Sequence, residues 1–96
     1  MLHILNKRIE YDVFFQRIAR EDALIFLGSS VLCLPSNAQT ADQLTRYCQN
    51  FQCYVLESDL LARGLKCNEI IAGIQPIDYS GFVALTTEHE VIKTWN

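Results

Sequence analysis

The stretch "ALIFLGSSVLCL", residues 23–34, is the most apolar run in this 96-residue chain. Its first part, up to Gly28, is apolar throughout, as is typical of a strand covered on both faces in a parallel sheet. The run is too short to span a bilayer, and Gly28, Ser29 and Ser30 interrupt it. We therefore predict a buried strand, then a tight turn and a short helix that stops near Pro35.

On both sides of this strand, short apolar runs alternate with helical patterns. Two stripes repeat with the 3.6-residue period of a helix, and they comprise Tyr11, Phe14, Phe15 and Ile18, then Ala41, Leu44, Cys48 and Phe51. Further strands are expected over residues 2–5, 53–57, 74–78 and 91–95, and Pro76 favours an edge or terminal position. The alternation predicts a three-layer α/β/α sandwich around a mostly parallel sheet of four or five strands.

Several residues in the C-terminal half have expected structural roles. Asp59 is expected to cap a short helix, and Asp78 or Ser80 to cap a later one. His89 falls on the apolar face of that later helix, where a histidine more often packs than catalyses. Trp95 is expected to dock either on its own core or on a neighbouring subunit.

The bulk composition bounds the class of protein. The length predicts a single domain, residues 1–96. Half of the residues are hydrophobic, a high share for a small domain, so a partner is expected to cover part of the apolar surface. With a net charge of −3, the chain is not expected to bind nucleic acid or an anionic membrane directly. Because no export signal is visible, we expect a cytoplasmic protein with reduced thiols.

Four cysteines raise the question of thiol or metal chemistry. Cys48 lies near the carboxyl end of its predicted helix, where the helix dipole disfavours a thiolate, and Cys53 begins a buried strand. Both are therefore expected to be core residues rather than a redox pair. The cysteines and the two histidines never form the paired spacings of a structural zinc site, and no metal or other cofactor is expected.

Cys33 and Cys67 are the better candidates for an exposed, reactive thiol. Each is expected near a loop or a helix end, and the charge of Lys66 beside Cys67 could favour a thiolate. Neither cysteine has a histidine base nearby in the sequence. An idle surface cysteine is the competing interpretation for both.

Gly28, Ser29 and Ser30 could present backbone N–H groups to an anion, as such turns do in nucleotide-binding α/β proteins. They match neither Gly-x-Gly-x-x-Gly nor Gly-x4-Gly-Lys-Ser/Thr. An ordinary turn between strand and helix is the favoured interpretation. A flavodoxin-like nucleotide-binding module stays an alternative that depends on the fold class and this turn alone.

Four segments spread over nearly the whole chain carry a family resemblance: "MLHILNK" (1–7), "ALIFLG" (23–28), "LESDLLARGL" (56–65) and "IDYSGFVALTTEHEVIKTW" (77–95). In this order they resemble the TusB/DsrH family of small subunits of bacterial sulfur-relay complexes. The resemblance implies a DsrE-like α/β fold and assembly with TusC-like and TusD-like subunits as a heterohexamer of two heterotrimers. It also implies a relay that takes persulfide sulfur from a TusA-like carrier and passes it through a TusE-like one for 2-thiolation of the wobble uridine in tRNA.

The resemblance implies an accessory, non-catalytic role, because the sulfur-accepting cysteine of that relay belongs to the TusD-type subunit. Some relatives carry a cysteine in the first helix, whereas residues 9–20 contain none here, so no catalytic residue is carried over. Two alternatives stay open: the chain itself carries sulfane sulfur on Cys33 or Cys67, or it serves a relay for sulfur oxidation.

Overall fold

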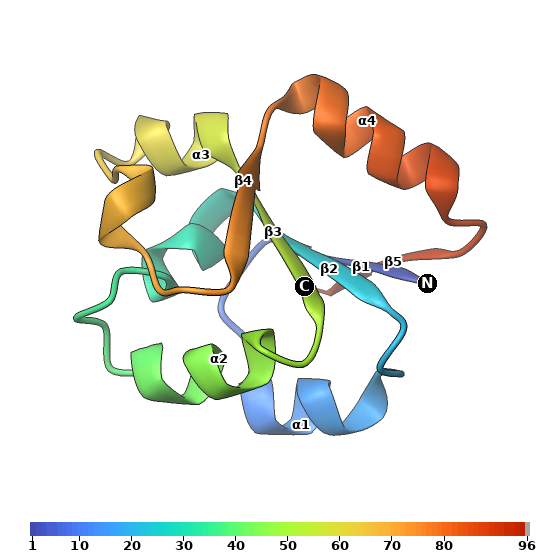
Figure 1. Ribbon diagram of the computed structural model, residues 1–96, viewed down its shortest axis with the longest axis horizontal. Coiled ribbons are helices and arrows are strands. Elements are labelled where there is room, and N and C mark those ends of the chain that lie inside the picture. Colours follow the sequence, from blue (N-terminus) through green and yellow to red (C-terminus); the bar gives the residue numbers. More distant parts are fainter. Residues whose placement is uncertain (96) are drawn as a thin grey trace.

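Five parallel strands form one sheet, in the order β4-β3-β2-β1-β5, in the computed structural model, which describes residues 1–95 (Figure 1). Every neighbouring pair is parallel, so all five strands run in the same direction. The strands are β1 (Leu2–Leu5), β2 (Ala23–Phe26), β3 (Gln52–Leu56), β4 (Ile74–Ile77) and β5 (Ile92–Trp95).

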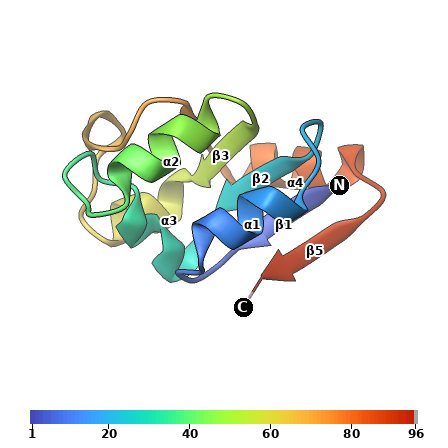
Figure 2. The ribbon, with the colours of Figure 1, turned by 90° about the horizontal axis from the view of Figure 1, so that it is seen from below.

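Helices cover both faces of this sheet. Figure 1 shows α1 (Tyr11–Arg17) and α2 (Ala41–Cys48) on one face, and α3 (Glu57–Ala62) and α4 (Tyr79–Glu88) on the other. In Figure 2, which is seen from below, α1 and α2 lie in front of the strands. Two short 3-10 helices, η1 (Gly28–Cys33) and η2 (Cys67–Glu69), complete the connections. The predicted three-layer α/β/α fold with a parallel sheet is confirmed. Within residues 1–95, no helix is both long and apolar enough to cross a bilayer.

The central strand β2 supplies both apolar layers. Leu24 and Phe26 point into the larger cluster, which α1 and α2 cover, whereas Ala23 and Ile25 join a smaller cluster beneath α4. All four side chains of β2 are fully buried. Alternate side chains of a strand point to opposite faces, so an all-apolar strand can only be accommodated between two layers of helix.

The two edge strands of the sheet carry Pro76 and Trp95. β4 carries Pro76 and lies at one edge, a position in which proline is tolerated because one side of the strand has no hydrogen-bonding partner strand. β5 lies at the other edge, and of its residues Trp95 alone is half-buried while the remaining ones are exposed. The side chain of Trp95 docks on its own core, beside His3 and Phe14.

One of the two predicted helix caps is correct and the other is wrong. The Asp78 carboxylate accepts a hydrogen bond from the Gly81 amide at 2.8 Å and caps α4. The short helix α3 begins at Glu57, directly after β3, so Asp59 lies inside its first turn instead of capping it. There its carboxylate accepts a hydrogen bond from the Gly28 amide at 2.7 Å, because tertiary contact brings the end of β2 close to α3.

Cys48 and Cys53 flank the connection between α2 and β3, as the sequence predicts. Cys48 is the last residue of α2 and Cys53 the second residue of β3, and their exposed fractions are 3% and 4%. Two causes raise the pKa of Cys53 far above that of a free thiol. The larger is a hydrogen bond with the Cys48 thiol, and the second is burial. Both residues therefore act as packing residues of the larger apolar cluster.

We expect Cys48 and Cys53 to resist alkylation in the folded protein and to react with N-ethylmaleimide after denaturation. Burial denies the reagent access to both thiols, and the raised pKa of Cys53 further disfavours its reactive thiolate. Peptide mass spectrometry after short labelling checks this, with the exposed Cys67 as the internal control that reacts without denaturation. Native labelling of Cys48 or Cys53 at the rate of Cys67 would contradict the packing role.

We expect Gly28→Ala to destabilise the fold by about 2–3 kcal/mol, because Gly28 has φ +58° and an added Cβ would lie 2.8 Å from the Asn6 carbonyl oxygen. Gly64→Ala is the matched control: its φ is +74°, but nothing lies within 4 Å of the added Cβ. We expect it to cost about 1 kcal/mol. Urea denaturation measures both, and equal losses would show that the contact with Asn6 is not the cause.

Candidate functional site

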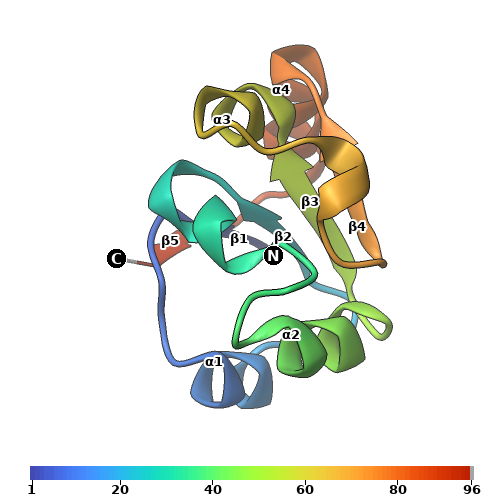
Figure 3. The same ribbon diagram turned by 90° about the vertical axis from the view of Figure 1, so that its left-hand side faces the viewer.

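The carboxyl ends of the strands are where parallel α/β sheets most often bind ligands. Here β1 ends at Leu5, β2 leads through Leu27 into η1, and β3 passes directly into α3 at Glu57. Figure 3 shows the short helical turns of η1, in teal, and of η2, in orange-yellow, in front of the strands. Any chemistry at this end therefore depends on η1, η2 and the first turn of α3.

The turn after β2 uses its polar groups within the fold. The Gly28 amide donates to the Asp59 carboxylate at 2.7 Å, and the Ser29 amide donates to the Asn6 carbonyl oxygen at 3.2 Å. The Ser30 hydroxyl is buried and lies within hydrogen-bond distance of the Leu5 carbonyl oxygen, at 2.6 Å. A phosphate would have to displace the chain's own carboxylate from Gly28, so the contacts favour an ordinary structural turn.

Cys33 lies at the end of η1, and its expected exposure is wrong. Its exposed fraction is 8%, and its side chain belongs to the larger apolar cluster. In η1 the neighbouring Leu32 points outward instead, with an exposed fraction of 57%. The short helix thus turns its cysteine toward the core, an orientation that a three-residue period allows and that the sequence did not reveal. Whether Cys33 accepts sulfur stays a prediction.

Cys67 is exposed and opens η2. Its Sγ lies 4.0 Å from Oε2 of Glu57, the first residue of α3. The turn that carries the thiol is held by two hydrogen bonds: the Lys66 amide donates to the Glu69 carboxylate at 3.0 Å, and the Glu69 amide donates to the Lys66 carbonyl oxygen at 3.0 Å. The site thus combines an accessible thiol with a carboxylate that can accept a hydrogen bond from it.

An open pocket of about 450 Å³ adjoins η2 on the side of the loop after η1, and it is lined by Pro35, Ser36, Asn37, Leu65, Asn68 and Glu69. The loop is held against η2, because the Ser36 amide donates to the Glu69 carbonyl oxygen at 2.9 Å. A second open pocket, of about 390 Å³, lies at the amino ends of β3 and β4. Neither pocket includes a histidine among its lining residues.

The ionisable residues do not assemble into a catalytic or metal-binding group around Cys67. Across residues 1–95, His, Cys, Asp and Glu side chains form no cluster of three that could hold a metal ion. His89 follows α4, and His3 is buried in β1. The arrangement at Cys67 can support thiol exchange, in which a thiolate attacks a sulfur atom, but it provides no imidazole to activate the thiol.

One polar cluster was missed by sequence reasoning. His3, in β1, lies 2.9 Å from the Asp22 carboxylate, and the Trp95 indole donates to its other ring nitrogen at 3.0 Å. The available signal was a histidine inside the apolar run "LHIL", which needs polar partners once it is buried. Those partners are 19 and 92 positions away in the sequence, and no local pattern identifies them.

Solved structures show the same fold at low sequence identity. The protein of unknown function MTH1491 from Methanobacterium thermoautotrophicum superposes with a TM-score of 0.79 at 10% identity, over 98% of this chain and 96% of that one. The ychN protein from E. coli superposes with a TM-score of 0.71 at 13% identity, over 98% of this chain and 97% of that one. The fold is therefore DsrE-like, as expected.

Sequence relatives are similar along almost the entire chain. A protein named TusB from Shigella flexneri is 34% identical over 100 residues, which span 99% of this chain and 100% of that protein. A TusB protein from Escherichia coli O139:H28 has the same identity and coverage. The family model described as "DsrH like protein" matches residues 6–92. This chain therefore belongs to the TusB/DsrH family.

Proposed function

We propose that this protein is an accessory subunit of a sulfurtransferase complex that relays persulfide sulfur for 2-thiolation of the wobble uridine in tRNA. The observation that carries the proposal is the 34% identity to TusB proteins over 99% of the chain. We propose further that residues 1–96 act as one DsrE-like domain in the cytoplasm.

The placement of the thiols supports an accessory role. All four cysteines lie in the part of the chain that the structure describes, and Cys33, Cys48 and Cys53 are buried. The remaining thiol, Cys67, has a carboxylate beside it but no histidine. A principal sulfur carrier needs an accessible, activated thiolate. We therefore assign the sulfur-accepting cysteine to a TusD-like partner subunit.

The outer surface of α4 supports assembly with partners. This helix buries a single residue, Leu85, beneath it, while Tyr79 has an exposed fraction of 70% and Val83 is exposed as well. Exposed large apolar side chains on the outer surface of one helix favour a surface that a partner covers in the assembled protein. We propose TusC-like and TusD-like subunits as the partners, in a heterohexamer of two heterotrimers, with TusA-like and TusE-like proteins as the sulfur donor and recipient.

A second candidate function is favoured by the exposure of Cys67. The Cys67 thiolate would attack the terminal sulfur of an incoming persulfide, forming a new S–S bond while the bond within the donor breaks. The donor leaves as a thiol, Cys67 becomes the persulfide, and the proton of Cys67 passes to the departing sulfur. Sulfane sulfur moves without net oxidation or reduction. The same chemistry would serve a relay for sulfur oxidation.

Co-expression with TusC-like and TusD-like chains tests the assembly. We expect one species that contains all three chains, two copies of each, when its mass is measured by size exclusion with multi-angle light scattering. The physical reason is the apolar surface that the isolated chain leaves exposed. Elution of this protein with the mass of one 96-residue chain, while its partners associate without it, would contradict the proposal.

Incubation of the assembled complex with a persulfide donor distinguishes the two candidate functions. We expect the TusD-like chain to gain about 32 Da, one sulfur atom, while this chain keeps its mass, because its one exposed thiol lacks an activating base. Intact-mass spectrometry reads both chains in one experiment. The matched control is Cys67→Ser: an adduct on this chain that disappears in this variant would establish the carrier function instead.

A further inference from the structure

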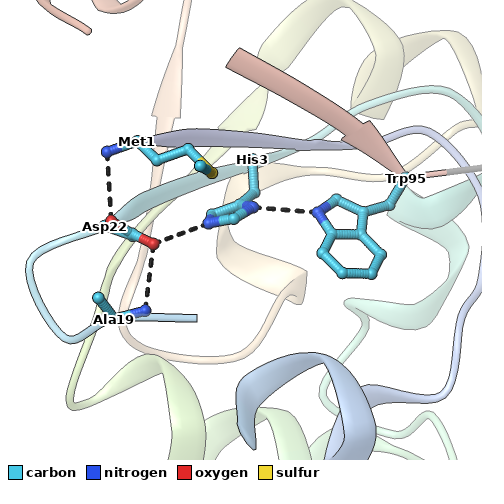
Figure 4. Close-up of polar contacts among 5 residues, drawn as sticks. All are labelled: Met1, His3, Ala19, Asp22 and Trp95. Atoms are coloured by element: carbon cyan, nitrogen blue, oxygen red, sulfur yellow. Dashed lines mark hydrogen bonds and ion pairs between the residues drawn. The ribbon is translucent and has the colours of Figure 1, made fainter. Parts of the chain in front are cut away.

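A buried histidine links the first strand to the last one (Figure 4). His3, in β1, has an exposed fraction of 3%. The Trp95 indole Nε1 donates a hydrogen bond to His3 Nδ1 at 3.0 Å, and His3 Nε2 lies 2.9 Å from the Asp22 carboxylate. The Asp22 carboxylate also accepts a hydrogen bond from the Ala19 amide at 3.1 Å and lies 3.2 Å from the N-terminal ammonium of Met1.

These partners determine the protonation state of the imidazole. An indole N–H can only donate, so His3 Nδ1 must carry a free lone pair. A carboxylate can only accept, so His3 Nε2 must carry the hydrogen. The ring is therefore neutral and held in its Nε2–H tautomer by its two neighbours.

The Asp22 carboxylate stays ionised in this setting. Burial by itself would raise the pKa of Asp22, but the hydrogen bonds from His3, the Ala19 amide and the N-terminal ammonium outweigh burial and hold that pKa below its usual value. Asp22 therefore keeps its charge through the neutral and mildly acidic range. The group of this cluster whose hydrogen-bonding pattern can change is the imidazole of His3, because it has both a protonated and an unprotonated ring nitrogen.

β5 depends strongly on this contact. It is an edge strand that pairs with β1 alone, and its residues other than Trp95 are exposed. Trp95 is the side chain through which β5 joins the apolar interior, packing edge-on against Phe14 with ring centroids 5.1 Å apart. A change at His3 is therefore transmitted directly to the last strand.

We propose that His3 is a proton-operated latch for β5: uptake of a second proton at Nδ1 removes the acceptor for the Trp95 indole and loosens the last strand from the sheet. The proton comes from solvent and occupies the lone pair that Trp95 uses in the neutral state. Two N–H groups would then face each other across 3.0 Å, and Trp95 has to move away. The latch is a property of this fold and does not depend on the sulfur relay.

The charged groups around the latch act in opposite directions. The Asp22 carboxylate attracts an imidazolium and thereby favours protonation. The Met1 ammonium, which shares Asp22, and the Lys93 ammonium, which lies 4.2 Å from the centroid of the Trp95 ring, oppose it. On the side of α1, the ring of His3 meets Phe14, which does not titrate.

NMR of the whole chain between pH 8 and pH 5 tests the latch. Trp95 is the sole tryptophan, so its indole N–H gives a single signal that needs no assignment. We expect this signal to be sharp and slow to exchange at pH 8, and to lose exchange protection by at least tenfold as the His3 ring signals titrate. An indole signal that keeps its shift and protection down to pH 5 overturns the proposal, whether or not His3 titrates.

Three variants separate the latch from a general effect of acid. His3→Gln keeps an acceptor and a donor but cannot titrate, so we expect its Trp95 signal to become independent of pH. His89→Gln, which changes the other histidine, should behave as the wild type. In Trp95→Phe the donor opposite His3 Nδ1 is gone, so we expect the midpoint of the His3 ring signals to lie at a higher pH than in the wild type.

The Trp95→Phe result keeps the test decisive if His3→Gln does not fold. If the midpoint of the His3 ring signals is unchanged or lowered in Trp95→Phe, the latch is contradicted. The Trp95 indole would then not oppose protonation of His3 Nδ1. Loss of indole protection on the same pH scale in a folded His3→Gln protein contradicts it as well.

Discussion

The complete burial of β2 is the constraint on which the rest of the structure depends. Its four apolar side chains point alternately into two clusters, so the strand is stable only between two layers of helix. Each large side chain buried in this way contributes about 1.5–3 kcal/mol relative to an exposed one. That strand therefore requires helices on both faces of the sheet. Helical crossovers connect parallel strands, so the carboxyl ends of all strands lie at the same edge of the sheet.

Polar groups at the carboxyl ends are satisfied mostly by the chain itself, which limits the chemistry that this end can perform. Asp59 occupies the Gly28 amide, and the Ser30 hydroxyl turns inward to backbone carbonyl groups. The accessible thiol at this end is that of Cys67, with the Glu57 carboxylate beside it. A scaffold of this kind suits a subunit that holds and positions partners, and the exposed apolar surface of α4 suits the same role.

The sequence predicts local structure well here and long-range contacts poorly. The strands, the helical stripes, the edge position of Pro76 and the burial of Cys48 and Cys53 follow from periodicity and single-residue chemistry. Asp59, in contrast, looks like a helix cap in sequence, but contact with the end of β2 gives its carboxylate another donor. Cys33 is turned inward by the geometry of η1, and the contact of His3 with Trp95 joins residues 92 positions apart. Family resemblance identified the TusB/DsrH family, but no residue pattern identified the cluster around His3.

The requirement for this chain in tRNA thiolation can be measured as the content of 2-thiouridine in tRNA. It would be measured by liquid chromatography with mass spectrometry in cells that lack this gene and carry either the wild-type gene or the Cys67→Ser variant. We expect deletion to remove the modification and both genes to restore it to the same level, because the proposed role requires this chain in the relay without sulfur on its own cysteine. Unchanged 2-thiouridine after deletion, or its restoration by the wild-type gene alone, would contradict the account.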